Sequence, residues 1–243
     1  IPPENILITG SPQFEPHFDP ALRKSRQDFI QEHGLDPKKE YLCFSGDDST
    51  TSPDDPQYLA DTAAAVAELN SQGHQLGIIF RRCPVDFSDR YDLVLQQYKG
   101  LIVPIAPRWQ QVGGSWNAIL PTKEDLKLQV NTILHSQLVV NLASSMVFDF
   151  ALFGKPCLYL NYEVEQKQDP KWTPQKVYNF VHFRSMPSQE AVIWLNSREE
   201  LPDKLKAALE APEAPVQAAK AWFGRINMPP YDKASERIWE GVE

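Results

Sequence analysis

The sequence predicts an α/β fold with a doubly wound, mostly parallel sheet. Seven short apolar runs alternate with segments whose apolar residues recur at helical spacing. The clearest unit is residues 138–160: an apolar run, a turn of small residues, an apolar helical segment ending at Gly154, and a second apolar run after Lys155-Pro156. Strand, turn, helix and strand in this order form the βαβ unit of a parallel sheet.

Length and composition indicate a single globular domain over residues 1–243. The chain has 42% hydrophobic and 23% charged residues, as ordinary globular proteins do. Its net charge of −8 argues against nucleic-acid binding, and it has no apolar run long enough to cross a bilayer. We therefore expect a cytoplasmic protein, associated with membranes only through other parts of a longer chain.

The three cysteines, Cys43, Cys83 and Cys157, lie far apart and lack the spacing of metal ligands. Each lies in or beside an apolar run, so we expect buried free thiols, in agreement with a reducing compartment. The chain opens on Ile1-Pro2-Pro3, without an initiating methionine or a signal-peptide pattern. We therefore expect a piece of a longer protein from which an N-terminal domain is missing.

The elements of the first half follow from apolar runs and from punctuating glycines and prolines. Residues 5–9 are strand-like, and Asp19 before Pro20 predicts a capped helix over residues 20–33 that ends at Gly34. Further expected elements are a strand at 41–45, a polar loop at 46–56, a helix at 57–71, a strand at 76–80, a helix at 89–98 and a strand at 101–106.

The second half begins with a Pro- and Gly-punctuated loop at residues 107–116, which holds Trp109 and Trp116. Thr122 then caps a helix whose apolar residues repeat at helical spacing from Leu126 to Leu134. After the βαβ unit we expect a polar and aromatic segment at 161–183, a strand at 191–195, a helix at 199–209 capped by Ser197, a hinge at 211–215 and amphipathic helices at 216–223 and 231–239.

The turn of the βαβ unit carries the main candidate site. Ser144 and Ser145, followed by Met146, precede the helix, and the free N–H groups of a helix start suit a phosphate. Asp149 lies four residues after Ser145, on the same side of the first turn, where a carboxylate can hold the hydroxyls of a ribose. The structural alternative is that the serines only cap the helix and that Asp149 complements its dipole.

Other candidates follow the neighbouring strands, because open α/β sheets bind ligands at the carboxyl ends of their strands. Gly46 opens the loop after the strand at 41–45; it can approach a diphosphate, although four aspartates in that loop would repel one. Arg81 and Arg82 end the next strand and can pair with a phosphate. Trp109 can stack on a nucleobase. The alternatives are an ordinary solvated loop at Gly46, an arginine pair solvated at a strand end, and plain packing of Trp109.

Three stretches together resemble the C-terminal, nucleotide-sugar-binding domain of GT-B glycosyltransferases and the related UDP-N-acetylglucosamine 2-epimerases. The specific part is residues 138–160, where Asp149 stands at the acidic position of the family, which is usually Glu, and Ser144-Ser145 stands at its phosphate turn. Weaker support comes from Gly10-Ser11-Pro12 and from residues 81–84, which are similar to an Arg-Pro-His-Pro segment with Cys83 in place of the histidine.

The resemblance implies the donor-binding half of a glycosyltransferase that uses a nucleotide diphosphate sugar, in surface polysaccharide synthesis. The helix start and cationic side chains would replace a metal, no cofactor is expected, and the acceptor would be a carbohydrate or a lipid-linked molecule. The catalytic base would belong to the N-terminal domain of the same protein, on which the helices at about 211–243 would dock. The alternatives are a sugar-nucleotide epimerase, a glycerophosphotransferase and a non-catalytic scaffold with a nucleotide-binding-like pocket.

Overall fold

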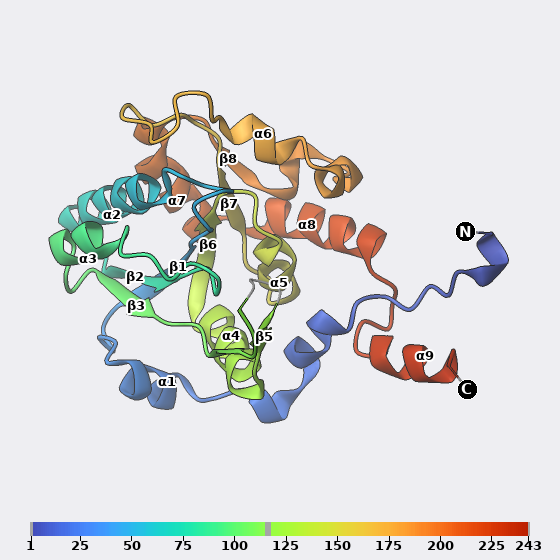
Figure 1. The fold of residues 1–243 in the computed structure, drawn as a ribbon. Helices are drawn as coiled ribbons and strands as arrows, with labels where there is room; N and C mark the ends of the chain where they lie inside the picture. Colours follow the sequence, from blue (N-terminus) through green and yellow to red (C-terminus); the bar gives the residue numbers. More distant parts are fainter. Residues whose placement is uncertain (1, 115–117, 243) are drawn as a thin grey trace.

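The computed structural model describes residues 2–114 and 118–242, and its centre is a six-stranded parallel sheet (Figure 1). The strand order is β3-β2-β1-β6-β7-β8, so the chain moves outward from β1 to one edge and then from β6 to the other. This is the doubly wound α/β fold that the sequence predicts. The strands are β1 Glu40–Ser45, β2 Leu76–Arg81, β3 Ile102–Ile105, β6 Ser136–Asn141, β7 Cys157–Leu160 and β8 Ile193–Leu195.

Helices cover both faces of the sheet, because successive strand residues point to opposite sides. Ile79 packs with Phe29 and Leu128 in one core, whereas its neighbours Ile78 and Phe80 belong to the larger core on the other side. The helices are α1 Arg26–His33, α2 Asp55–Ser71, α3 Asp92–Gln97, α4 Lys123–Leu134, α5 Met146–Leu152, α6 Pro174–Tyr178, α7 Leu201–Glu210, α8 Glu213–Ile226 and α9 Ala234–Glu240. None of the helices in the described ranges combines the length and apolarity that crossing a bilayer requires.

The N-terminal segment differs from the prediction. The expected strand at residues 5–9 is wrong: Ile6, Leu7 and Ile8 are 54%, 59% and 71% exposed and pair with no strand of the described chain. The expected helix at 20–33 is interrupted. Asp19 caps only a 3₁₀ turn, Pro20–Leu22, and Ser25 caps a separate α1 by accepting a hydrogen bond from the Asp28 amide. The predicted end at Gly34 is confirmed, with φ 61°.

The segment expected as a loop at 107–116 contains a strand. β4 Trp109–Gln111 pairs antiparallel with β5 Ile119–Pro121, and these strands are too short to leave a clear alternating pattern. Trp116 lies outside the described residues. The helix expected at 89–98 is shortened to α3, because Tyr91 packs in the core as its N-cap residue.

The C-terminal helices also differ from the expectation. The hinge expected at 211–215 is reduced to Ala211 and Pro212, since α8 begins at Glu213 and Pro215 fits in its first turn. Ser197 does not cap α7 with its side chain; a 3₁₀ turn lies between them. Trp222 of α8 packs edge-to-face on Phe148 of α5, with ring centroids 4.7 Å apart. Helix α8 therefore completes the core of this domain, and docking on an N-terminal domain stays a prediction.

Candidate functional site

The centre of the site is the point where the strand order reverses, between β1 and β6. A pocket of about 240 Å³ opens there at the carboxyl ends of β1, β2 and β6, as expected for an open α/β sheet. We call it the switch-point pocket. Asp149 does not line it, but the other predicted site residues do: Gly46, Arg81, Arg82, Trp109, Ser144, Ser145 and Met146.

The turn after β6 forms one wall of this pocket. The Ser144 amide donates to Asn141 Oδ1 at 2.9 Å, and Ala143 takes a left-handed conformation with φ 56° that makes the turn tight. Ser144 Oγ accepts a hydrogen bond from the Met146 amide at 3.3 Å, so Ser144 supplies the capping contact. Ser145 is exposed and makes no capping contact, which leaves its hydroxyl available at the pocket.

The two arginines at the carboxyl end of β2 have different environments. Arg81 is 5% exposed, and its Nη2 lies 2.8 Å from Asp125 Oδ2, so a buried carboxylate already compensates its charge. Arg82 is half-buried; its Nη1 donates to the Ser88 carbonyl, and its guanidinium lies 5.1 Å from the centre of the Tyr91 ring. The arginine charge with access to the pocket is therefore that of Arg82.

Trp109 and Gly46 each have a structural role of their own at the pocket. Trp109 Nε1 donates to Asp125 Oδ2 at 2.7 Å, which fixes the indole while its ring lines the pocket. Gly46 is explained by packing, since a Cβ there would lie 2.8 Å from Phe80 Cε2. The Gly46 amide donates to the Arg81 carbonyl, so it is not free for a diphosphate.

Asp149 lies behind the pocket wall. It is 5% exposed, and its Oδ1 lies 2.5 Å from His17 Nε2, a residue from the N-terminal segment. Gln129 Nε2 also donates to this oxygen at 3.3 Å, and Gln129 lines the pocket. Asp149, which was predicted to bind the ribose, therefore already contacts His17 and Gln129 of the same chain. Gln129 connects Asp149 to the pocket. Neither His17 nor Gln129 was singled out by the sequence pattern.

Arg90 organises the acidic loop that follows β1. Its Nη1 donates to the Ser52 carbonyl at 2.7 Å, its Nη2 to the Asp47 carbonyl at 2.5 Å, and its Nε to Asp86 at 2.7 Å. Asp55 accepts hydrogen bonds from Tyr91 Oη and Ser52 Oγ inside the same loop. The loop is thus built around one guanidinium, a role that the sequence does not reveal because Arg90 lies on a distant segment.

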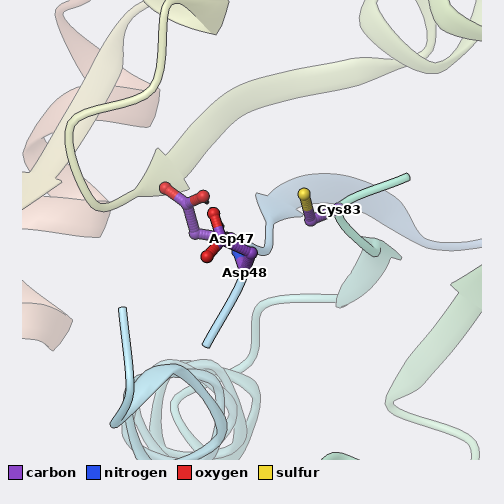
Figure 2. Close-up of side chains that lie close together, drawn as sticks. All are labelled: Asp47, Asp48 and Cys83. Carbon is purple, nitrogen blue, oxygen red and sulfur yellow. Dashed lines mark hydrogen bonds between the residues drawn. The ribbon is translucent and has the colours of Figure 1, made fainter. Parts of the chain in front are cut away.

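Asp47, Asp48 and Cys83 lie together at the edge of the pocket, after β1 and β2 (Figure 2). One potential ligand atom from each lies within 4.8 Å of the others. The carboxylate of Asp48, however, accepts hydrogen bonds from Thr50 and Thr51, and burial raises the pKa of the Cys83 thiol to about 11. We assign no metal to this group. Cys43 and Cys157 are buried free thiols, as predicted, and Cys83 is half-buried.

The acidic loop makes stability depend on pH. Burial, together with the charge of Asp55, raises the pKa of Asp47 to about 7, and burial raises the pKa of Asp55 to about 6. The folded chain therefore binds more protons than the unfolded chain between about pH 4 and pH 7, and this contribution to stability is lost as the pH rises.

The variant Asp47→Asn lacks this loss. We expect its free energy of unfolding in urea, relative to that of the parent chain, to rise by about 1–2 kcal/mol as the pH goes from 5 to 8. Asp89→Asn, at an exposed position, is the control and should show a constant difference; a constant difference for Asp47→Asn as well would contradict the prediction.

Comparisons with known proteins bear on the fold. No protein-family model and no curated protein matches the sequence. Among solved structures, Staphylococcus aureus MnaA with UDP has a TM-score of 0.53 at 14% identity, covering 99% of this chain and 53% of that chain. The Neisseria meningitidis UDP-GlcNAc 2-epimerase bound to UDP-GlcNAc has a TM-score of 0.53 at 11% identity, covering 100% of this chain and 56% of that chain. The wall teichoic acid polymerase TagF with CDPG has a TM-score of 0.55 at 14% identity, covering 100% of this chain and 50% of that chain.

The chain has the Rossmann-like α/β fold found in these structures. It spans about half the length of each of these structures. The class of domain expected from residues 138–160 is thereby supported at the level of the fold, while the identities of 11–14% carry no statement about activity.

Proposed function

We propose that this domain binds a nucleoside diphosphate sugar in the switch-point pocket and is the donor-binding half of a glycosyltransferase of surface polysaccharide synthesis. The observation that carries the proposal is the convergence of Arg82, Trp109 and the turn at Ser144-Ser145 on one pocket at the reversal of strand order. A cation, a rigid aromatic ring and hydroxyls next to a helix start match the diphosphate, the base and the phosphate oxygens of such a ligand.

The chemistry proposed for this half is binding and stabilisation of the leaving group. Arg82 neutralises the negative charge that develops on the nucleoside diphosphate as the sugar leaves, and the hydroxyl of Ser145 donates to a phosphate oxygen. Trp109 holds the base, and Gln129 faces the ribose in place of the engaged Asp149. A pocket of about 240 Å³ is smaller than a complete small-molecule site, which supports the sugar and the acceptor being held by the second half.

The test is a thermal-shift series with UDP, CDP, GDP and ADP. A ligand present at about 100 times its Kd stabilises a protein by about 2.7 kcal/mol, or roughly 5–10 °C for a domain of this size. We expect UDP or CDP to give such a shift, because the structural neighbours include a complex with UDP and one with CDPG. Arg82→Ala should reduce the shift, and Arg225→Ala, at an exposed position of α8, should not. No shift with any nucleotide, on this domain and on the full-length protein, would contradict the proposal.

A non-catalytic scaffold is the second candidate. It is favoured by the pairing of Asp149 with His17 and of Arg81 with Asp125, which occupies two predicted ligand side chains within the chain. Nucleotide binding without turnover by the full-length protein would support it. An epimerase would instead invert the sugar of UDP-GlcNAc without an acceptor, and a glycerophosphotransferase would consume a CDP-linked glycerol phosphate, so product analysis separates these outcomes.

A further inference from the structure

A second cavity, of about 520 Å³, lies at the carboxyl ends of β7 and β8. Its volume is within the range of small-molecule sites. Asn161 follows β7 directly and Asn196 follows β8 directly, so the cavity lies on the same edge of the sheet as the switch-point pocket. The two cavities have none of their lining residues in common. We call it the amide cavity.

The polar lining of the amide cavity consists of carboxamides. Gln175 Nε2 donates to Asn161 Oδ1 at 2.7 Å, and Asn161 Nδ2 donates to Asn196 Oδ1 at 2.8 Å, which fixes three amides in a chain. The side chains of Asn179 and Gln189 make no hydrogen bond to another described residue and are exposed at the cavity. Each carboxamide has both donors and an acceptor, the combination that a hydroxyl group requires.

The apolar lining consists of Met186 and three aromatic rings, and the polar groups of Tyr178 and Trp194 already have partners. Tyr178 Oη donates to the Leu160 carbonyl at 2.7 Å, and Trp194 Nε1 donates to the Gln189 carbonyl at 2.9 Å. The two rings pack edge-to-face with centroids 4.9 Å apart, and Phe183 lies beside them. These side chains therefore present apolar ring surface to the cavity, next to the amides.

The lining of the amide cavity favours a neutral ligand over an ionised one. Among the described residues that line the amide cavity none is charged, although 23% of the chain is charged. Lys167, a basic residue of the same segment, pairs with Glu163 and does not line it. A buried phosphate or carboxylate without a cationic partner is costly, whereas a neutral ligand is not.

From these features we propose that the amide cavity is a binding site for a neutral, hydroxyl-rich ligand, namely a carbohydrate unit. Sugar hydroxyls exchange hydrogen bonds with the carboxamides, and the apolar face of the sugar ring packs on Trp194 and Tyr178. This site is separate from the nucleotide proposal and stands without it. Tyr159 connects the two, since its Oη donates to the Ser144 carbonyl at 2.8 Å while its ring packs on Tyr178 and Trp194.

The test is a titration followed through the side-chain amide signals of asparagine and glutamine in ¹⁵N NMR spectra. The probes are glucose, N-acetylglucosamine, maltotriose and chitotriose, with glucuronate and inorganic phosphate for comparison. We expect at least one neutral sugar to shift the amide signals of Gln175 and Asn179 in a saturable way, with a Kd of about 1 mM or lower. The two anions should leave them unchanged.

Variants make the assignment specific. Gln175→Ala with Asn179→Ala changes two exposed side chains and should weaken sugar binding about tenfold, or about 1.4 kcal/mol. Gln72→Ala, which changes an exposed amide near the amino end of β2, should not weaken sugar binding. Arg82→Ala should leave sugar binding intact, which separates this proposal from the nucleotide site. Absence of a saturable shift with all four neutral sugars, or equal binding by the double variant, would overturn the proposal.

Discussion

Replacing Asp125 by alanine is expected to lower the free energy of unfolding by about 3–5 kcal/mol, because the buried guanidinium of Arg81 would lose its partner. Asp125 is 1% exposed, pairs with Arg81 at 2.8 Å and accepts hydrogen bonds from Trp109 Nε1 and from the Arg108 amide, both at 2.7 Å. One carboxylate thus fixes two side chains of the switch-point pocket. Urea unfolding at pH 7 measures the loss.

A double variant distinguishes the cost of leaving Arg81 without its partner from the cost of losing the Asp125 side chain itself. Arg81→Met with Asp125→Leu removes both charges and keeps apolar volume, so it should recover at least half of the stability that Asp125→Ala loses. Asp89→Ala, at an exposed position, should stay within about 0.5 kcal/mol of the parent chain. Equal losses for the single and the double variant would refute the view that the unpaired guanidinium carries the cost.

Arg90→Lys is expected to cost about 2–4 kcal/mol and to loosen the acidic loop. Lysine keeps the charge but cannot reproduce the planar arrangement with which Arg90 reaches Asp86 and the carbonyls of Ser52 and Asp47 together. Hydrogen exchange should accelerate most at amides whose acceptors lie within the loop, such as those of Asp47 and Ser52.

Arg82→Lys is the matched control for Arg90→Lys, because Arg82 is half-buried and its side chain makes one hydrogen bond within the described residues, to the Ser88 carbonyl. It should cost less than about 1 kcal/mol. If Arg90→Lys leaves both the unfolding free energy and the exchange of the loop amides unchanged, Arg90 does not organise this loop.

Much of the fold could be predicted because it follows from patterns among residues that are neighbours in the sequence. The unit from β6 through α5 to β7 follows from contiguous apolar runs and from Gly154, and the helix α4 follows from Thr122, whose Oγ1 accepts a hydrogen bond from the Asp125 amide. The gathering of most predicted site residues in one pocket followed from a general rule on parallel sheets, since most of these residues stand at the carboxyl end of a strand or in the loop after it.

The rest depends on contacts between distant segments. The pairing of His17 with Asp149 joins residues 132 positions apart, and no local pattern indicates it. The same holds for the contacts of Arg90 with the Ser52 and Asp47 carbonyls, which lie 38 and 43 residues earlier. Residues 5–9 have the apolar pattern of a strand, but the extended segment lies along the C-terminal region, where Thr9 accepts a hydrogen bond from Arg237, instead of at a sheet edge.

Hydrogen bonds join the N-terminal segment to the C-terminal region, and both ends of the described chain lie on the same side of the domain (Figure 1). The Ser11 amide donates to Asn227, and Glu15 accepts hydrogen bonds from Ser235, so residues from opposite ends brace each other. The N-terminal segment and the C-terminal region are therefore one packed unit, so shortening the chain on either side would remove hydrogen bonds that hold the other.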